Sequence, residues 1–167
     1  ANADLDTTGG SQNNGAVTLL VDGGIGSVAI NSSITTLGGT GNVSITSGSG
    51  GVTQAGTSTV DAGGGTILVD GGNGNIDLLG SWTTTNASTT AVRIIDATTV
   101  ALGTITASGT VVLGEAGVDN LSGAITQNGT TEISAGTLLV TAGDAVTLNN
   151  ANSIGTLGSV TRGGAFS

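Results

Sequence analysis

Apolar residues alternate with polar residues in short runs along most of the chain, and many of the apolar positions are Val or Ile. A period of two with β-branched enrichment is typical of β-strands. No window of eleven residues carries the apolar stripe of an amphipathic helix, so the pattern predicts an all-β protein. The alternating sets are Val17/Leu19/Val21, Val28/Ile30, Val43/Ile45, Ile67/Val69, Ile76/Leu78, Val92/Ile94, Val100/Leu102, Val111/Leu113, Leu138/Val140 and Val146/Leu148.

The alternating segments belong to an internal repeat. The sequence TLLVDGG at 18–24 returns as TILVDGG at 66–72, and half of that offset aligns Leu19 with Val43. VTQAG at 52–56 also returns as ITQNG at 125–129, at close to three times the half offset. These spacings indicate a unit of about 24 residues, with small slips absorbed in loops.

Strands this short cannot bury a face alone, but coils stacked ~4.8 Å apart would pair every strand in parallel and place like side chains over like. The sequence therefore predicts a single-stranded parallel β-solenoid of about six to seven coils over residues 1–167, as one repeat domain. An antiparallel sandwich, with turns at Asn73-Gly74 and Asn128-Gly129, is the alternative. The solenoid is favoured because a hairpin fold does not require a fixed repeat. The absence of Pro also fits the solenoid, whose interior strands have neighbours on both sides and use every backbone N–H in hydrogen bonds.

The composition narrows the chemistry. The 167 residues include 32 Gly but no Pro, Cys, Met, Tyr or His, and 2 basic against 11 acidic residues give a net charge of −9. Without His or Cys there is no imidazole base, thiolate nucleophile, or nitrogen or sulfur metal ligand. Nucleic-acid binding needs a basic stripe, which this chain lacks. We expect no enzymatic activity, no small-molecule substrate, no cofactor and no metal.

Two acidic patterns have simpler interpretations than a site. Residues 71–77 come near the calcium-binding nonapeptide, but the Asp falls one place late and the sibling segment 23–29 has none, so turn glycines are the better interpretation. Asp22 and Asp70 occupy the same repeat position with Thr46 between them. Stacked like charges would destabilise a ladder, so this spacing indicates tolerated surface charge and not a carboxylate dyad.

Ice binding and polysaccharide cleavage are two further alternatives. Flat solenoid faces of outward Thr-x-Thr can order water, but the threonine pairs here are mostly adjacent, which puts one side chain in and one out. Carboxylate catalysis needs aromatic or basic groups beside a groove, and only Trp82, Arg93 and Arg162 could serve. Trp82 replaces Ile34 in the repeat, which suggests an enlarged or partly exposed apolar site.

Several segments resemble the passenger repeats of filamentous haemagglutinin-like exoproteins. They are GAITQ at 123–127, ISAGTL at 133–138, AGDAVTL at 142–148 and NSIGTL at 152–157. The resemblance implies a right-handed parallel β-helix from a bacterial surface adhesin exported by two-partner secretion. It covers most of residues 15–165, but the amino-terminal secretion domain of that family is not seen.

The function expected from this resemblance is structural and adhesive. We expect a secreted, extracellular segment that acts as a stiff shaft and contact surface, with its own copies or a host cell surface as partner and with no membrane span. A second hypothesis is a subunit of a filament joined by end-to-end stacking of coils. Residues 163–167 read like the start of another strand, so a processed or excised segment without its own caps is expected.

One outer face is predicted to be a contact surface. If the alternating apolar residues point inward, the residue between each pair points outward. Four large aliphatic side chains then form a stripe that we interpret as an interface, unless a flanking loop of the same chain folds over it. The outward positions, coil by coil, are Leu20, Ser44, Leu68, Arg93, Val112 and Leu139.

Overall fold

The computed structural model describes residues 5–6, 15–21, 24–36, 39–117 and 120–167. These residues form strands, turns and bends, with no helix among them, as the alternation predicts. The strands are β1 (Leu5–Asp6), β2 (Val17–Leu20), β3 (Ser27–Ile30), β4 (Ile34–Thr35), β5 (Val43–Thr46), β6 (Gly51–Gln54), β7 (Thr59–Asp61), β8 (Ile67–Leu78), β9 (Ser81–Thr84), β10 (Val92–Leu102), β11 (Thr104–Leu113), β12 (Ile125–Gln127), β13 (Ile133–Ala142), β14 (Val146–Thr147) and β15 (Ser153–Arg162).

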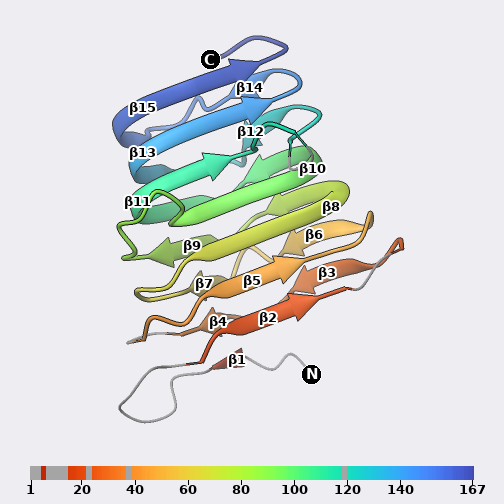
Figure 1. Ribbon diagram of the computed structural model, residues 1–167, viewed down its shortest axis with the longest axis vertical. Helices are drawn as coiled ribbons and strands as arrows, with labels where there is room; N and C mark the ends of the chain where they lie inside the picture. The colour runs from red at the N-terminus through yellow and green to blue at the C-terminus, as the bar shows by residue number, and fades with distance from the viewer. Residues whose placement is uncertain (1–4, 7–14, 22–23, 37–38, 118–119) are drawn as a thin grey trace.

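The strands wind into a parallel β-solenoid of about six turns, stacked from the N-terminal to the C-terminal end (Figure 1). Every pairing between the described strands is parallel, which confirms the predicted fold class and excludes the antiparallel sandwich. Three faces surround the core. Face A contains β2, β5, β8, β10, β11, β13 and β15; face B contains β3, β6, β8, β10, β12 and β14; face C contains β1, β4, β7, β9, β11, β13 and β15. Long strands such as β8 bend around a corner and serve two faces.

Aliphatic columns fill the interior. Residues that pair across neighbouring strands stack on one another, and their side chains are almost completely buried. Each column is continuous through the coils, so every coil buries apolar surface against the coil before and the coil after it. The columns are Val17, Val43, Ile67, Val92, Val111 and Leu138 on face A; Val52, Ile76, Val100, Ile125 and Val146 on face B; and Ile34, Val60, Trp82, Ile105 and Ile133 on face C.

The coils follow one another at a spacing of roughly 24 residues, as predicted, but the spacing is not constant. On face A the first coil is longer than this average, because Val17 pairs with Val43. The predicted alignment of Leu19 with Val43 is therefore wrong by two residues, although the two lie in neighbouring strands. On face B Val28 pairs with Val52, so the segment from Val17 to Val28 is two residues longer than the paired segment from Val43 to Val52.

Glycines at the corner between faces A and B are required by the close stacking of turns. Gly72 has φ +54°, and a Cβ at this position would collide with the carbonyl oxygen of Ser47 in the coil below. Asn73 follows with φ 64°, a conformation that Asn tolerates better than most residues. Residues 71–73 thus form a tight bend within β8, in agreement with the interpretation that the glycines here serve a turn, and residues 75–77 pair again on face B.

Candidate functional site

The outward column of face A contains most of the predicted interface residues. Thr18, Ser44, Leu68, Arg93, Val112 and Leu139 stack in register. Leu20 does not belong to this column, because the two-residue correction places it beside Thr46. It remains an outward side chain with 64% of its surface exposed. The structure thus brings Leu68, Val112 and Leu139 together and moves Leu20 to the neighbouring column.

The stripe on face A is partly covered from within the chain. The Arg93 guanidinium forms a bidentate ion pair with Glu115, whose carboxylate follows β11; both N···O distances are 2.8 Å. Val112 stacks between Arg93 and Leu139 and is only 5% exposed. Leu68 and Leu139 are half-buried. The predicted stripe of four exposed aliphatic side chains is therefore wrong at Val112, and a salt bridge crosses its middle.

A shallow groove of about 280 Å³ lies on face A beside this stripe. Its walls combine aliphatic, hydroxyl and amide groups with one guanidinium, which is already paired with Glu115. The groove is a shallow depression in the outer surface of face A. Its lining residues are Asn42, Val43, Ser44, Thr66, Ile67, Leu68, Thr90 and Arg93.

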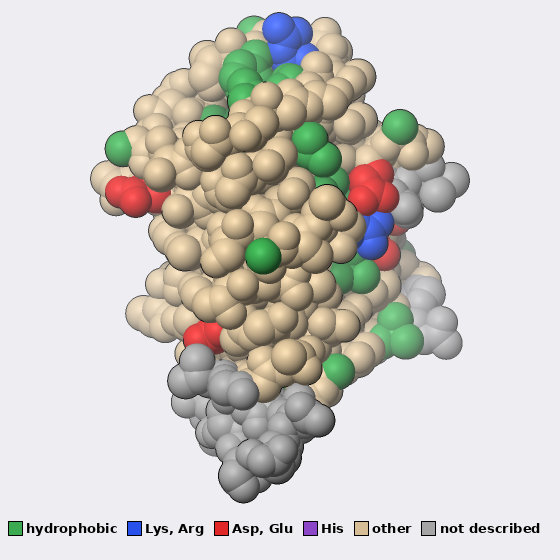
Figure 2. Space-filling model, turned by 60° about the vertical axis from the view of Figure 1, so that its left-hand side comes forward, with side chains coloured by type: hydrophobic (Ala, Val, Ile, Leu, Met, Phe, Trp, Pro, Cys, Tyr) green, Lys and Arg blue, Asp and Glu red, His purple; other side chains and the backbone are tan. Residues whose placement is uncertain are grey.

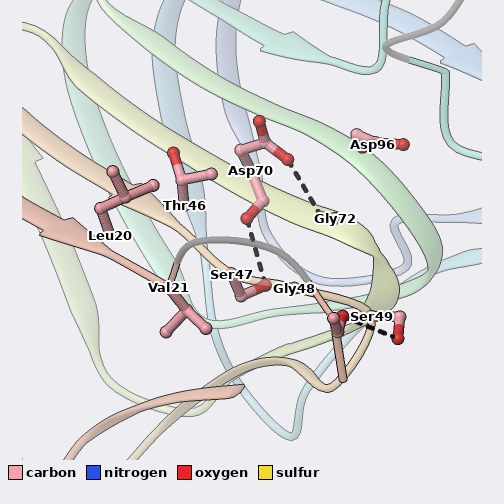
Figure 3. A pocket seen from close by; sticks show the side chains of 10 residues that line it. Leu20, Val21, Thr46, Ser47, Gly48, Ser49, Asp70, Gly72 and Asp96 are labelled. Carbon is pink, nitrogen blue, oxygen red and sulfur yellow. Dashed lines mark hydrogen bonds between the residues drawn. The ribbon is translucent and has the colours of Figure 1, made fainter. Parts of the chain in front are cut away.

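A second groove, of about 390 Å³, lies at the corner between faces A and B (Figure 3). Leu20, Thr46 and Asp70 come from three successive strands and stand in one outward column. Asp70 Oδ1 accepts a hydrogen bond of 3.0 Å from the Gly72 N–H, which fixes the carboxylate beside the turn. Thr46 and Asp70 share a column, as the repeat predicts. The residue before Thr46 in this column is Leu20. Asp22, which the repeat aligns with Thr46 and Asp70, lies outside the described residues.

Hydroxyl groups cover much of face C. Thr84 is buried while Thr83 and Thr85 point outward, as predicted for adjacent threonines, but the prediction is wrong for the pairs Thr89/Thr90 and Thr98/Thr99, in which both residues are exposed. The outward column through Thr83 is interrupted by Asp61, and serines replace threonine further along it. The face therefore lacks an unbroken Thr-x-Thr array, in line with the preference for ordinary strand threonines. The column is Thr35, Asp61, Thr83, Thr106, Ser134 and Ser153.

Sequence reasoning missed a polar cluster inside the solenoid. Trp82 is 1% exposed, so of the two expected outcomes, an enlarged or a partly exposed apolar site, partial exposure is excluded. Its indole Nε1–H donates to Gln54 Oε1 at 2.6 Å. The same oxygen accepts from the Gly80 N–H at 3.0 Å, and Gln54 Nε2 donates to the Ser58 carbonyl at 3.2 Å. A buried amide with both ends paired fixes the corner between faces B and C.

The signal for this cluster was the VTQAG/ITQNG repeat, because Gln127 occupies the equivalent corner. Gln127 Nε2 donates to the Thr131 carbonyl at 3.3 Å, just as Gln54 bonds Ser58 four residues on. Ser58 and Thr131 also make equivalent hydrogen bonds. The Ser58 hydroxyl donates to the Ala55 carbonyl, and the Thr131 hydroxyl donates to the Asn128 carbonyl, in each case three residues earlier in the chain. The repeated Gln therefore has a structural role, because it hydrogen-bonds the backbone of the same turn in both coils.

The C-terminal coil exposes apolar side chains that earlier coils bury. Leu157 and Phe166 are 52% and 37% exposed, and with Val160, Thr161 and Arg162 they line a groove of about 470 Å³. Leu157 pairs with Leu138, so it extends an interior column of face A to the surface of this end. Figure 2 shows hydrophobic side chains beside a basic group at the same end. A further coil of the same kind would cover them.

Two other features bear on the expected chemistry. Among the described residues, no three carboxylate, imidazole or thiol side chains come together in a group able to hold a metal ion. The described part of the chain also has no helix of the length and apolarity that crossing a membrane requires.

Comparisons with protein-family models, with curated proteins and with solved structures gave no match to this chain.

Proposed function

We propose that the chain is a structural and adhesive segment of a secreted bacterial β-solenoid, acting outside the cell as a stiff shaft and contact surface. The main support is the stack of parallel coils on continuous aliphatic columns, which makes a rod whose length follows from the number of repeats. The resemblance to filamentous haemagglutinin-like passenger repeats supports extracellular display and export by two-partner secretion. No step of this role requires catalysis or a cofactor.

Adhesion is assigned to face A, where Leu68 and Leu139 flank the Arg93–Glu115 pair. Half-buried aliphatic side chains around an ion pair offer a partner apolar surface to bury, and the charged groups can orient the partner through hydrogen bonds. On faces B and C the outward columns are mainly Thr, Ser, Ala and Asp, so face A is the more adhesive of the three.

The test compares cell binding by the purified chain and by the double variant Leu68→Asp, Leu139→Asp. Both positions point outward, so we expect the far-UV circular dichroism to be unchanged while binding to host cells is lost. The matched control is Thr53→Asp with Thr126→Asp, on the outward side of face B. Unchanged binding by the face A variant, or no binding by the native chain, contradicts the adhesive role.

A filament subunit is the second candidate, and the exposed C-terminal coil favours it. Among the described residues β15 pairs with β13 alone, so another coil could extend the sheet in parallel at its other edge and cover Leu157 and Phe166. That coil could belong to the same polypeptide or to another copy. Sedimentation velocity and electron microscopy of the purified chain should then show rods longer than one copy, which Leu157→Asp abolishes; a monodisperse monomer at high concentration contradicts this role.

A further inference from the structure

The corner groove between faces A and B combines an aliphatic wall with carboxylates. Leu20 is 64% exposed and presents its side chain to the groove, whereas the side chain of Val21, which also lines the groove, points to the opposite side of the strand (Figure 3). Asp70 and Asp96 also line it, and the Thr46 hydroxyl lies in the same column as Leu20 and Asp70 (Figure 3). The groove is thus apolar along one side and negatively charged along another.

The Asp70 carboxylate is held in place but retains hydrogen-bonding capacity. Its Oδ1 accepts from the Gly72 N–H, and within the described part of the chain Oδ2 accepts no hydrogen bond. The side chain is half-buried, so it is open to a ligand from outside. Carboxylate oxygens act only as acceptors, and a hydroxyl can accept as well, so the polar side of the groove suits a donor with several N–H groups.

A cation for this groove must come from another molecule. The chain contains no Lys and only two Arg residues, against 11 acidic residues. Arg93 pairs with Glu115, and Arg162 lies in β15 at the C-terminal end, where its Nη1 donates to the Gly164 carbonyl. Charge complementarity therefore favours a basic partner at this corner.

We infer that the groove docks a lysine side chain of a partner protein. The four-carbon stem of lysine would lie along Leu20, and its compact ammonium group, with three donors, would meet the Asp70 carboxylate and the Thr46 hydroxyl, which stand in the same outward column. A bare metal ion would leave the aliphatic wall without a role. A neutral saccharide would leave the Asp70 carboxylate without a counter-charge. The inference specifies the partner chemistry of the adhesive shaft and so rests on the proposed function.

The experiment is a nuclear magnetic resonance titration of the isotope-labelled chain with a blocked pentapeptide, Gly-Gly-Lys-Gly-Gly. We expect saturable shifts of the amide signals of Thr46, Asp70 and Gly72, which weaken in high salt because exposed ion pairs are screened. Asp70→Asn keeps an acceptor for the Gly72 N–H and should weaken binding about fivefold. Leu20→Ser should also weaken it, by removing part of the aliphatic wall.

The matched control is Asp61→Asn. Asp61 is half-buried and its Oδ1 accepts from the Gly63 N–H at 2.8 Å, so the substitution makes the same chemical change at a corner outside the groove. We expect this variant to bind the peptide as the native chain does. The inference is wrong if Asp70→Asn also binds unchanged, or if the peptide leaves the three groove amides unmoved.

Comparison ligands separate the other possible occupants. The acetyl-lysine peptide keeps the stem without the charge, the arginine peptide has a planar cation, and calcium chloride and a neutral disaccharide test the remaining chemistries. Equal or stronger binding of any of these overturns the lysine assignment. Loss of lysine docking with intact cell adhesion would refute this inference alone, whereas lysine docking without cell adhesion would refute the adhesive function.

Discussion

At the scale of single residues, Trp82 is fixed by packing and by one buried hydrogen bond to Gln54. Trp82→Phe keeps a ring in the face C column but removes the donor and some volume. We expect the free energy of unfolding to fall by about 1–3 kcal/mol, measured by urea denaturation followed by far-UV circular dichroism. In a Gln54→Leu background the same substitution should cost less, because the acceptor is already gone. Equal costs in both backgrounds would show that the hydrogen bond is unimportant.

Ile67 and its neighbour Leu68 test inward against outward orientation. Ile67 is 1% exposed in the face A column, whereas Leu68 is half-buried on the outer side. Ile67→Ala should reduce the free energy of unfolding by ~2–5 kcal/mol, as for other buried aliphatic residues. Leu68→Ala should cost clearly less. Fluorescence of Trp82, the only tryptophan, can follow both transitions, and a reversed order of the two costs would contradict the assigned faces.

At the scale of elements, the stacked turns limit which residues can occupy the corners. Gly72 and Gly24 both have positive φ, at +54° and +70°, but only Gly72 has backbone of the coil below where a Cβ would stand; Gly24 has open space. Gly72→Ala therefore adds a steric clash to a conformational cost of about 1–2 kcal/mol, and Gly24→Ala has the conformational cost alone. We expect a markedly larger fall in melting temperature for Gly72→Ala, and equal falls would be inconsistent with the close stacking of these turns.

Strands were more predictable from the sequence than the turns that join them. Alternation marks inward positions locally, so most of the buried column of face A, from Val43 to Leu138, could be identified from the repeat. Register depends on loop length, and the two extra residues before β3 shifted Leu19 and Leu20 relative to the next coil. Contacts between distant positions, such as Arg93 with Glu115, depend on side-chain reach across coils and leave no periodic signal.

For the whole molecule, calcium should leave stability unchanged. The described residues hold no group of three potential metal-ligating side chains, and a ligand stabilises a fold only by binding the native state more tightly than the unfolded state. We expect the same melting temperature, by circular dichroism, in millimolar calcium chloride and in excess chelator. A rise of many degrees with calcium would revive the calcium-binding interpretation of residues 71–77.

The stacking of coils is tested most directly by distances between spin labels on face B. The chain has no Cys, so labels attach only where cysteines are introduced. Ala29, Thr53, Asp77, Ala101, Thr126 and Thr147 form one outward column, in which each step is one coil. At ~4.8 Å per step, labels at Ala29 and Thr126 should lie about 19 Å apart, and labels at Ala29 and Thr147 about 24 Å apart. Electron–electron double resonance that finds distances unrelated to the number of coils would contradict the parallel solenoid.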